Sequence, residues 1–348
     1  MKPSEFRQFA VKALPRGRRI MTEGKPGVGK TTLWMEVCEI LGWDFIGISM
    51  PLEDPSTIRG YPSRGTDGRA HHCLFDGIAR AMDATKPTFL LADDMGMAGE
   101  STAKAFLRFA QFGEIDGRKL PEHVVIGAAT NDIGHGAGVF GLIEPLKSRF
   151  HTIVTIETSI DDVVGYGLSR NWPAWLLAYI RNVGEPIFDW KPSKSMHNDG
   201  ATPRTLEYVA EWDNEGFDDP EVWAGAIGKG RAGEASNFKR LINDLPDIDA
   251  VLLDPDTAPV PDNPSAKLLV AMSLAVRLTA GNFGQVVTYL KRLPQPLRAY
   301  SLRDAMRAEN EKRQRKILPP DHKAITASRD FTAWACSADG KDILSATA

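Results

Sequence analysis

Gly24-Lys25-Pro26-Gly27-Val28-Gly29-Lys30-Thr31 is the stretch of sequence that decides the fold. It fits the pattern G-x-x-x-x-G-K-[ST] at every fixed position. Glycines in this pattern let the backbone curl so that its N–H groups point inward, toward the oxygen atoms of a phosphate. A helix that begins at Lys30 would add the positive end of its dipole. The pattern therefore predicts a loop that binds a nucleoside triphosphate, and an ordinary glycine-rich turn is the alternative.

Each residue type in this loop has an expected role. Lys30 is expected to reach the β- and γ-phosphates, and the Thr31 hydroxyl is expected to bind Mg²⁺. A short strand, Arg19–Thr22, would lead into the loop, and a helix over Lys30–Leu41 would follow it. The residues expected to bind ATP are Gly24, Pro26, Gly27, Val28, Gly29, Lys30, Thr31 and Thr32.

Length and composition agree with a globular protein of more than one domain. The chain has 348 residues, of which 43 % are hydrophobic and 25 % are charged, and these are ordinary globular values. The net charge of −3 gives no general attraction to nucleic acid or to acidic membranes. No apolar run is long enough to span a bilayer or to form a signal peptide, and the three cysteines form no motif. We therefore expect a cytoplasmic protein without membrane contact.

Residues 1–158 alternate short apolar segments with helical ones. This alternation is typical of an α/β fold, here a three-layer P-loop sandwich with a mostly parallel sheet. The expected strands are Arg19–Thr22, Asp44–Ser49, Thr88–Ala92, Val124–Ala129 and Ile153–Ile156. The expected helices between them are Lys30–Leu41, Leu74–Ala84, Glu100–Phe112 and Ile143–Ser148.

After Ile156 the pattern changes to helices alone. We expect a nucleotide-binding domain over residues 1–158, a smaller all-helical lid domain over residues 159–250, and a helical C-terminal extension over residues 251–348. Prolines stand where a first helical turn tolerates them. The expected helices are Asp161–Ser169, Pro173–Asn182, Pro203–Trp212, Pro220–Gly228, Asn237–Asn243, Ala266–Leu278, Phe283–Arg292 and Leu302–Lys316, with a linker at Pro246–Pro264.

Two of the expected strands end in polar side chains. One ends in Asp93-Asp94, and an apolar strand that ends in acidic residues can place carboxylates beside Mg²⁺. Asp93 is the expected metal partner, and Asp94 stands where a base that activates water belongs. The next strand ends in Thr130-Asn131. If these strands are neighbours, the Asn131 amide can orient the attacking water or touch the γ-phosphate, although an asparagine there can also simply form a turn.

Taken in order, these segments resemble a AAA+ ATPase, and more narrowly the MoxR-like branch of that superfamily. The resemblance covers roughly residues 15–215, and it is the order and spacing of the segments that make it specific. The matching segments are Asp54–Gly60, Leu90–Met95, Gly113–Pro121 as a hairpin, Thr130-Asn131 as the sensor asparagine, Leu146–Phe150 as the arginine-finger segment and Thr202–Arg204 as the second sensor.

The resemblance implies roles for two arginines. Arg149 would act on the nucleotide of a neighbouring subunit, where an arginine finger can speed hydrolysis by about 10³–10⁵. Arg204 would reach back over the phosphates of its own subunit and couple the nucleotide state to the angle of the lid. Each of them could also be an ordinary surface arginine. Together with Asp94 and Asn131, they are the expected catalytic residues.

The family also implies an assembly and a type of partner. Because the finger works only between subunits, a ring is implied, most simply a hexamer, which remodels or matures a protein client. Such ATPases often act with a separate partner that carries a von Willebrand factor A domain. Asp94 departs from the family, which usually has glutamate there. The shorter carboxylate loses about 1 Å of reach toward a lytic water, so we expect slow hydrolysis.

Two other functions stay open. A nucleotide switch that does not hydrolyse ATP is suggested by Asp94 alone. A nucleic-acid motor or loader would use the positive side chains on and before the C-terminal helix, although nearby acidic residues dilute them and a solvated face is the simpler interpretation. These side chains are Arg298, Arg303, Arg307, Lys312, Arg313, Arg315 and Lys316. A second glycine-rich run, Gly134–Gly141, lacks lysine and is expected to be a mobile loop.

Overall fold

The computed structural model describes residues 1–115, 117–132, 144–192 and 198–345. The Gly134–Gly141 run therefore lies outside the described residues. The chain divides into two compact units, Met1–Thr158 and Ser159–Ala348, and each is described by itself. No described helix combines the length and the apolar character needed to cross a bilayer.

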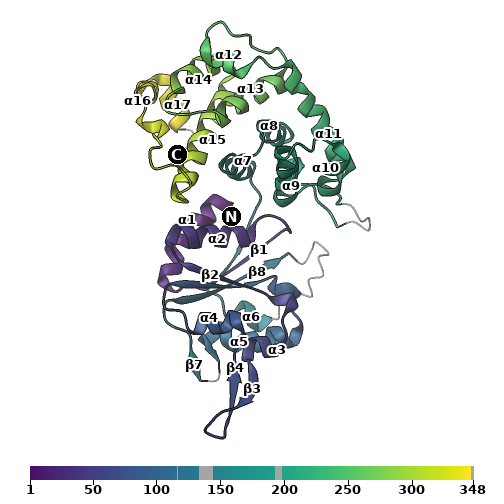
Figure 1. Ribbon diagram of the computed structural model, residues 1–348, viewed down its shortest axis with the longest axis vertical. Coiled ribbons are helices and arrows are strands. Elements are labelled where there is room, and N and C mark those ends of the chain that lie inside the picture. Colours follow the sequence, from purple (N-terminus) through teal and green to yellow (C-terminus); the bar gives the residue numbers. More distant parts are fainter. Residues whose placement is uncertain (116, 133–143, 193–197, 346–348) are drawn as a thin grey trace. The chain divides into compact units, whose positions relative to one another are not determined.

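The first unit is built on a five-stranded parallel sheet (Figure 1). Its strands lie side by side in the order β2-β5-β8-β1-β9, and each neighbouring pair is parallel. The strands are β1 (Ile20–Gly24), β2 (Asp44–Ser49), β5 (Thr88–Asp93), β8 (Val124–Asn131) and β9 (Thr152–Thr155). Because β8 lies between β5 and β1, the carboxyl ends of these three strands meet at one edge of the sheet.

Helices cover both faces of this sheet and produce the expected three layers (Figure 1). The alternation along β5 shows how they are held. Phe89 and Leu91 join a core with α1 and α2, whereas Leu90 and Ala92 join a second core with α4 and α5. The helices are α1 (Pro3–Ala13), α2 (Lys30–Leu41), α3 (Pro55–Arg59), α4 (Asp76–Met82), α5 (Glu100–Phe112) and α6 (Glu144–Lys147). The predicted fold class is confirmed.

Helix α2 is fixed firmly on the sheet. Gly29 precedes this helix and Gly42 follows it, and both glycines are left-handed, with φ of 89° and 68°. Trp34 is fully buried and stacks on Phe89 with the ring centroids 4.3 Å apart. Its Nε1 donates to Thr22 Oγ1 of β1 at 3.1 Å. The loop that precedes α2 is therefore held at a defined place above the sheet edge.

Two antiparallel hairpins extend the first unit. The strands β6 (Glu114–Ile115) and β7 (Arg118–Lys119) pair within the segment where the resemblance implies a hairpin. The strands β3 (Tyr61–Arg64) and β4 (Ala70–Cys73) form another hairpin, which the sequence pattern does not predict. Figure 1 shows β3 and β4 projecting beyond α3, α4 and α5.

The second unit is helical in its described part, apart from one isolated β-bridge. Its helices are α7 (Ile160–Ser169), α8 (Ala174–Val183), α9 (Pro203–Asn214), α10 (Pro220–Ile227), α11 (Lys229–Lys239), α12 (Ile248–Leu253), α13 (Pro264–Val276), α14 (Phe283–Leu290), α15 (Gln295–Gln314), α16 (Arg329–Cys336) and α17 (Ala338–Ser345). Two cores lie within it, and α13 packs against α8 while α15 packs against α7. The boundary expected at residue 250 stays a prediction.

Some predicted elements of this unit differ from the structure. The sequence predicts a linker over Pro246–Pro264, whereas α12 lies inside it because Val251 buries its side chain. It also predicts a helix over Asn237–Asn243, whereas α11 begins at Lys229 and ends at Lys239. Helix α15 begins earlier than predicted, since a proline is tolerated in its first turn.

Candidate nucleotide-binding site

The loop between β1 and α2 forms the centre of the site. Gly27 and Gly29 have φ of 76° and 89°, a region that residues with side chains rarely adopt. At Gly24 a Cβ atom would lie 2.8 Å from the carbonyl oxygen of Ile156, so only glycine fits there. Val28 is buried in the core beneath α2. Among the described residues, no side chain caps the first N–H groups of α2, an arrangement that favours an anion at this helix end.

Lys30 places a cation inside this loop. Its side chain is buried, with 7 % of the residue exposed. Its Nζ donates to the carbonyl oxygens of Gly24 and Lys25 at 3.0 and 3.1 Å, and to Asn131 Oδ1 at 2.8 Å. The ammonium group is therefore held where the sequence pattern predicts the phosphates.

Thr31 and Asp93 meet beside the loop. Thr31 Oγ1 of α2 donates to Asp93 Oδ2 of β5 at 2.7 Å. Both side chains offer oxygen atoms, which are the ligands that Mg²⁺ prefers. The residues present therefore fit a magnesium site. Pro26 and Thr32 are half-buried, one in the loop and the other in the first turn of α2.

Asn131 connects the loop with the acidic end of β5. Its Nδ2 donates to Asp94 Oδ1 at 3.1 Å, while its Oδ1 accepts from Lys30. This is possible because β8 pairs with both β5 and β1. The two strands are neighbours, so the condition for a role of the Asn131 amide is met, and this amide joins the cation of the loop to a carboxylate.

Asp94 has an unusual backbone conformation. Its φ of 51° and ψ of 38° lie in the left-handed region, which aspartate tolerates better than most residues. Its N–H donates to Asp93 Oδ1 at 3.0 Å. The two adjacent carboxylates thereby serve different partners, since Asp93 contacts Thr31 and Asp94 contacts Asn131. Backbone strain of this kind is often found at functional sites.

Arg149 is not part of this cluster. It follows α6, and its Nη1 donates to Ser148 Oγ at 2.7 Å. Soon after it, the His151 N–H donates to the Arg19 carbonyl oxygen, and β9 begins opposite Ile20. Arg149 therefore lies near the amino edge of the sheet, whereas Lys30 and its neighbours lie at the carboxyl edge.

Arg204 belongs to the other unit. It is exposed in the first turn of α9, which begins at Pro203 behind the N-cap Thr202. The Thr202 side chain accepts a hydrogen bond from the Thr205 N–H at 3.2 Å, and this cap fixes the start of the helix. The roles of Arg149 and Arg204 remain predictions.

The structure adds residues that the sequence analysis does not single out. Ser49 ends β2 in register with Asp93, so another hydroxyl stands at this edge of the sheet. The sequence contains a signal for Ser49, because this residue ends a strand in the same way as Asp93 and Asn131 do. Trp34, which anchors α2, gives no local signal because its partner Phe89 lies far along the chain.

Fold and loop together define the class, a P-loop α/β fold with a parallel sheet. No protein-family model and no curated protein matches the chain. Among solved structures it is similar to the RuvB Holliday junction branch migration motor of Thermotoga maritima, with 16 % identity over 83 % of this chain and 86 % of that one, at a TM-score of 0.41. It is also similar to NtrX from Brucella abortus in complex with ADP, with 15 % identity over 90 % of this chain and 64 % of that one, at a TM-score of 0.35. Similarity at this level carries no inference about activity. The assignment of the site therefore depends on the contacts between residues of this chain.

Proposed function

We propose that this chain is a AAA+ ATPase of the MoxR-like branch, which binds ATP with Mg²⁺ and hydrolyses it to ADP and phosphate. The observation that carries the proposal is the contact of Asn131 with both Lys30 and Asp94, next to the contact of Thr31 with Asp93. A cation, two oxygen ligands, a carboxylate and an amide thereby meet at the carboxyl edge of a parallel sheet. Ligands of open parallel sheets bind at this edge.

The side chains divide the work of hydrolysis. The loop N–H groups and Lys30 bind the phosphates and stabilise the charge that develops on the γ-phosphoryl group. Thr31 and Asp93 would hold Mg²⁺, which when bound neutralises further phosphate charge. Asp94 accepts a proton from the attacking water, and Asn131 orients that water.

A ring is part of the proposal because of the place of Arg149. A five-residue strand such as β1 is about 16 Å long, and Arg149 lies near the end opposite the loop. A finger at that position can serve the site of a neighbouring subunit but not its own. We propose a hexamer in the cytoplasm that remodels a protein client, with a separate von Willebrand factor A domain protein as partner. Arg204 would supply a second cation from the lid.

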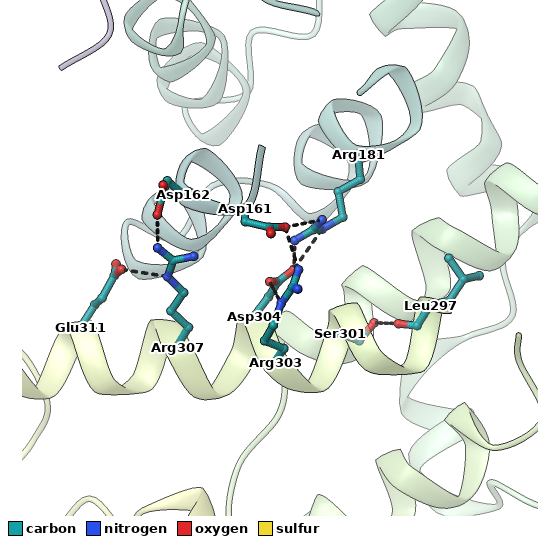
Figure 2. A network of polar contacts seen from close by, with 9 residues as sticks. All are labelled: Asp161, Asp162, Arg181, Leu297, Ser301, Arg303, Asp304, Arg307 and Glu311. Carbon is teal, nitrogen blue, oxygen red and sulfur yellow. Dashed lines mark hydrogen bonds and ion pairs between the residues drawn. The ribbon is translucent and has the colours of Figure 1, made fainter. Parts of the chain in front are cut away.

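A nucleic-acid motor has less support, because the basic residues of α15 are engaged within the second unit. Figure 2 shows Arg303 and Arg307 directed at carboxylates of α7. Arg303 Nη2 contacts Asp161 at 2.7 Å, and Arg307 donates to Asp162. Burial lowers the pKa of Lys312 on the same helix. This part of α15 therefore packs against α7 of the same unit instead of presenting a basic face to solvent.

The proposed site is tested with Lys30→Ala. The change removes the cation of the loop, so the variant is expected to lose ATP binding in a titration with a fluorescent ATP analogue, and to lose phosphate release. Lys25→Ala is the matched control, because Lys25 is exposed in the same loop. Chelation of Mg²⁺ is expected to stop phosphate release by the wild type. Unchanged ATP affinity in Lys30→Ala would contradict the proposed site.

A further inference from the structure

The β3–β4 hairpin buries almost nothing. Every residue of β3 is exposed, and so is every residue of β4 except His72. Tyr61 is 62 % exposed, and its ring meets the edge of the Phe75 ring at 6.3 Å. A two-stranded hairpin gains little stability by itself. Its exposed side chains are therefore available to contact another molecule.

The hairpin also carries unbalanced positive charge. Arg59, Arg64 and Arg69 form no ion pair with any residue that the structure describes. Asp67 is the one acid in the sequence between Arg59 and Cys73. It accepts from the Arg69 N–H at 3.0 Å and contacts His71 Nε2 at 2.9 Å, and these bonds lower the pKa of its carboxyl. The whole chain is acidic, so this local positive charge favours an anionic partner.

A cavity of about 280 Å³ lies at the foot of the hairpin. Its lining includes the charged residues Arg59, Arg108 and Glu114 together with the apolar residues Ala105 and Ile115. Arg108 is paired with Glu114 at 3.0 Å, so among the described lining residues Arg59 supplies the positive charge that forms no ion pair. The volume lies just below that of small-molecule pockets, about 300–1,000 Å³. Positive charge next to apolar residues suits a polypeptide with acidic and apolar residues better than the phosphates of a nucleic acid.

We propose that the hairpin and this cavity form a docking site for an acidic polypeptide segment. Carboxylates of the segment pair with Arg59, Arg64 and Arg69, and one apolar side chain enters the cavity. Arginine suits this role because its planar guanidinium binds a carboxylate through two parallel hydrogen bonds. The inference rests on the proposed function in one respect, since the acidic segment is the part of the client that the ATPase holds.

The charge requirement is tested by fluorescence anisotropy on the full chain. The probe is a short fluorescein-labelled peptide of glutamates around one central leucine, and binding is expected to saturate and to weaken with salt. Arg59→Ala and Arg64→Ala are each expected to weaken binding by about three- to fivefold, the effect of one exposed ion pair. Arg18→Ala is the matched control, because Arg18 is exposed in the same unit outside the hairpin. A peptide with lysines in place of the glutamates is expected not to bind.

The cavity requirement is tested with Ala105→Leu. Ala105 lines the cavity from α5, and leucine keeps the charge and the helix propensity of this position. The variant is expected to weaken the leucine peptide and to leave an all-glutamate peptide unaffected. Equal binding of the leucine peptide to the wild type, Arg59→Ala and Arg64→Ala would overturn the proposal. Tighter binding of oligothymidylate than of the acidic peptide would overturn it in favour of a nucleic acid.

Phosphate release by the same variants separates this inference from the proposed function. Arg59→Ala and Ala105→Leu are expected to keep the basal ATPase rate of the wild type and its thermal unfolding curve. Peptide binding by a wild type that releases no phosphate would refute the ATPase and leave the docking site standing. Phosphate release without peptide binding would refute the docking site alone.

Discussion

At the scale of single residues, one backbone contact and one side-chain contact hold Asp94 in place. Its backbone N–H donates to Asp93, and its carboxylate accepts from Asn131. The left-handed backbone costs about 1–2 kcal/mol, so the surrounding contacts must hold it. The carboxylate is also one methylene shorter than the glutamate that the AAA+ resemblance implies. A short and held carboxylate predicts slow proton transfer, and this keeps a nucleotide switch as the second candidate function.

Substitutions of Asp94 separate these two candidates. Asp94→Glu is expected to keep or raise the rate, because the longer side chain restores the reach toward water. Asp94→Asn is expected to lower kcat by about 10²–10⁴, the usual contribution of a general base, with unchanged ATP affinity. Phosphate release and ATP titration measure both. A rate abolished in Asp94→Glu with intact ATP binding would contradict the assignment of the base.

The reactivity of Cys38 shows whether the core between α2 and the sheet is folded, because Cys38 is buried there. Burial raises the pKa of its thiol to about 12, whereas the pKa of a cysteine thiol in an unfolded chain is about 8.5. Because the thiolate is the reactive form, Cys38 is expected to react with a disulfide reagent only on unfolding, after the exposed Cys73 and Cys336. Its contribution to the free energy of unfolding is present below the unfolded pKa and is lost as pH rises toward the folded pKa. Thiol titration with and without denaturant measures this order, and three equally fast thiols would contradict it.

At the scale of elements, buried ion pairs fasten α15 to α7 and α8 (Figure 2). Arg181 of α8 donates to Asp304 of α15 at 3.0 Å and to Asp161 of α7 at 3.1 Å. Asp304 is fully buried, and this burial raises its pKa although Arg181 and Arg303 act to lower it. Charges removed from water in this way are costly unless each keeps its partner. The network therefore makes the packing of α15 depend on its complete set of partners.

Arg181→Met is expected to lower the free energy of unfolding by about 3–5 kcal/mol, because Asp304 stays buried without this partner. The double variant with Asp304→Leu is expected to recover most of the loss, since Asp161 keeps Arg303. The loss in the single variant should shrink toward acid, because the raised pKa lets Asp304 take up a proton in the folded state first. Denaturant unfolding of the full chain, at neutral and at acidic pH, measures the free energy of unfolding of the wild type, the single variant and the double variant.

Arg277→Met is the control for this network, because Arg277 pairs with Asp249 at an exposed site, with an N–O distance of 2.5 Å. It is expected to cost less than about 1 kcal/mol. A double variant as unstable as Arg181→Met would show that the ion pairs are not the cause.

Elements with local signals are predicted well from the sequence. Helix α2 spans Lys30–Leu41 as predicted, because glycines mark both of its ends. The β3–β4 hairpin is missed, since Tyr61-Pro62-Ser63-Arg64 shows no apolar alternation and pairs through a polar turn. The ion-pair network is missed for another reason. Asp161 and Arg303 are far apart in the sequence, so no local pattern relates them.

In the candidate site, too, local sequence signals predict the residues but not their contacts. The sequence predicts Lys30, Thr31, Asp93 and Asn131 as candidates, because each ends a strand or opens a helix in a recognisable pattern. It does not predict which of them touch. The bonds of Asn131 with both Asp94 and Lys30 require β8 to lie between β5 and β1, which follows from the packing of the whole sheet. The left-handed turn at Asp94 likewise has no sequence signature.

At the scale of the whole molecule, the proposed hydrolysis calls for an arginine that the described residues of the first unit do not bring to the site. Asp93 and Asp94 bring two carboxylates to the ammonium of Lys30, and the proposed Mg²⁺ would offset part of their charge. Negative charge also develops on the γ-phosphoryl group during hydrolysis, and a further cation is the usual answer. Arg149 lies near the other edge of the sheet, and its Nε has no hydrogen-bond partner in the described part of the chain. An arginine finger is therefore expected from a second copy of the chain, in addition to the proposed cation of Arg204.

Mixing two inactive variants tests whether the site is shared. Arg149→Ala chains keep the loop and the base, whereas Asp94→Asn chains keep the finger, and each alone is expected to lose about 10²-fold or more of the rate. In an equal mixture, about a quarter of the contacts in a randomly assembled ring would join an intact Asp94 to an intact Arg149. Phosphate release by the mixture is expected to approach that fraction of the wild-type rate, with light scattering to verify mixed assembly. Assembled mixtures without recovery would contradict a finger acting between subunits, and a wild-type rate in Arg149→Ala alone would exclude Arg149 from hydrolysis.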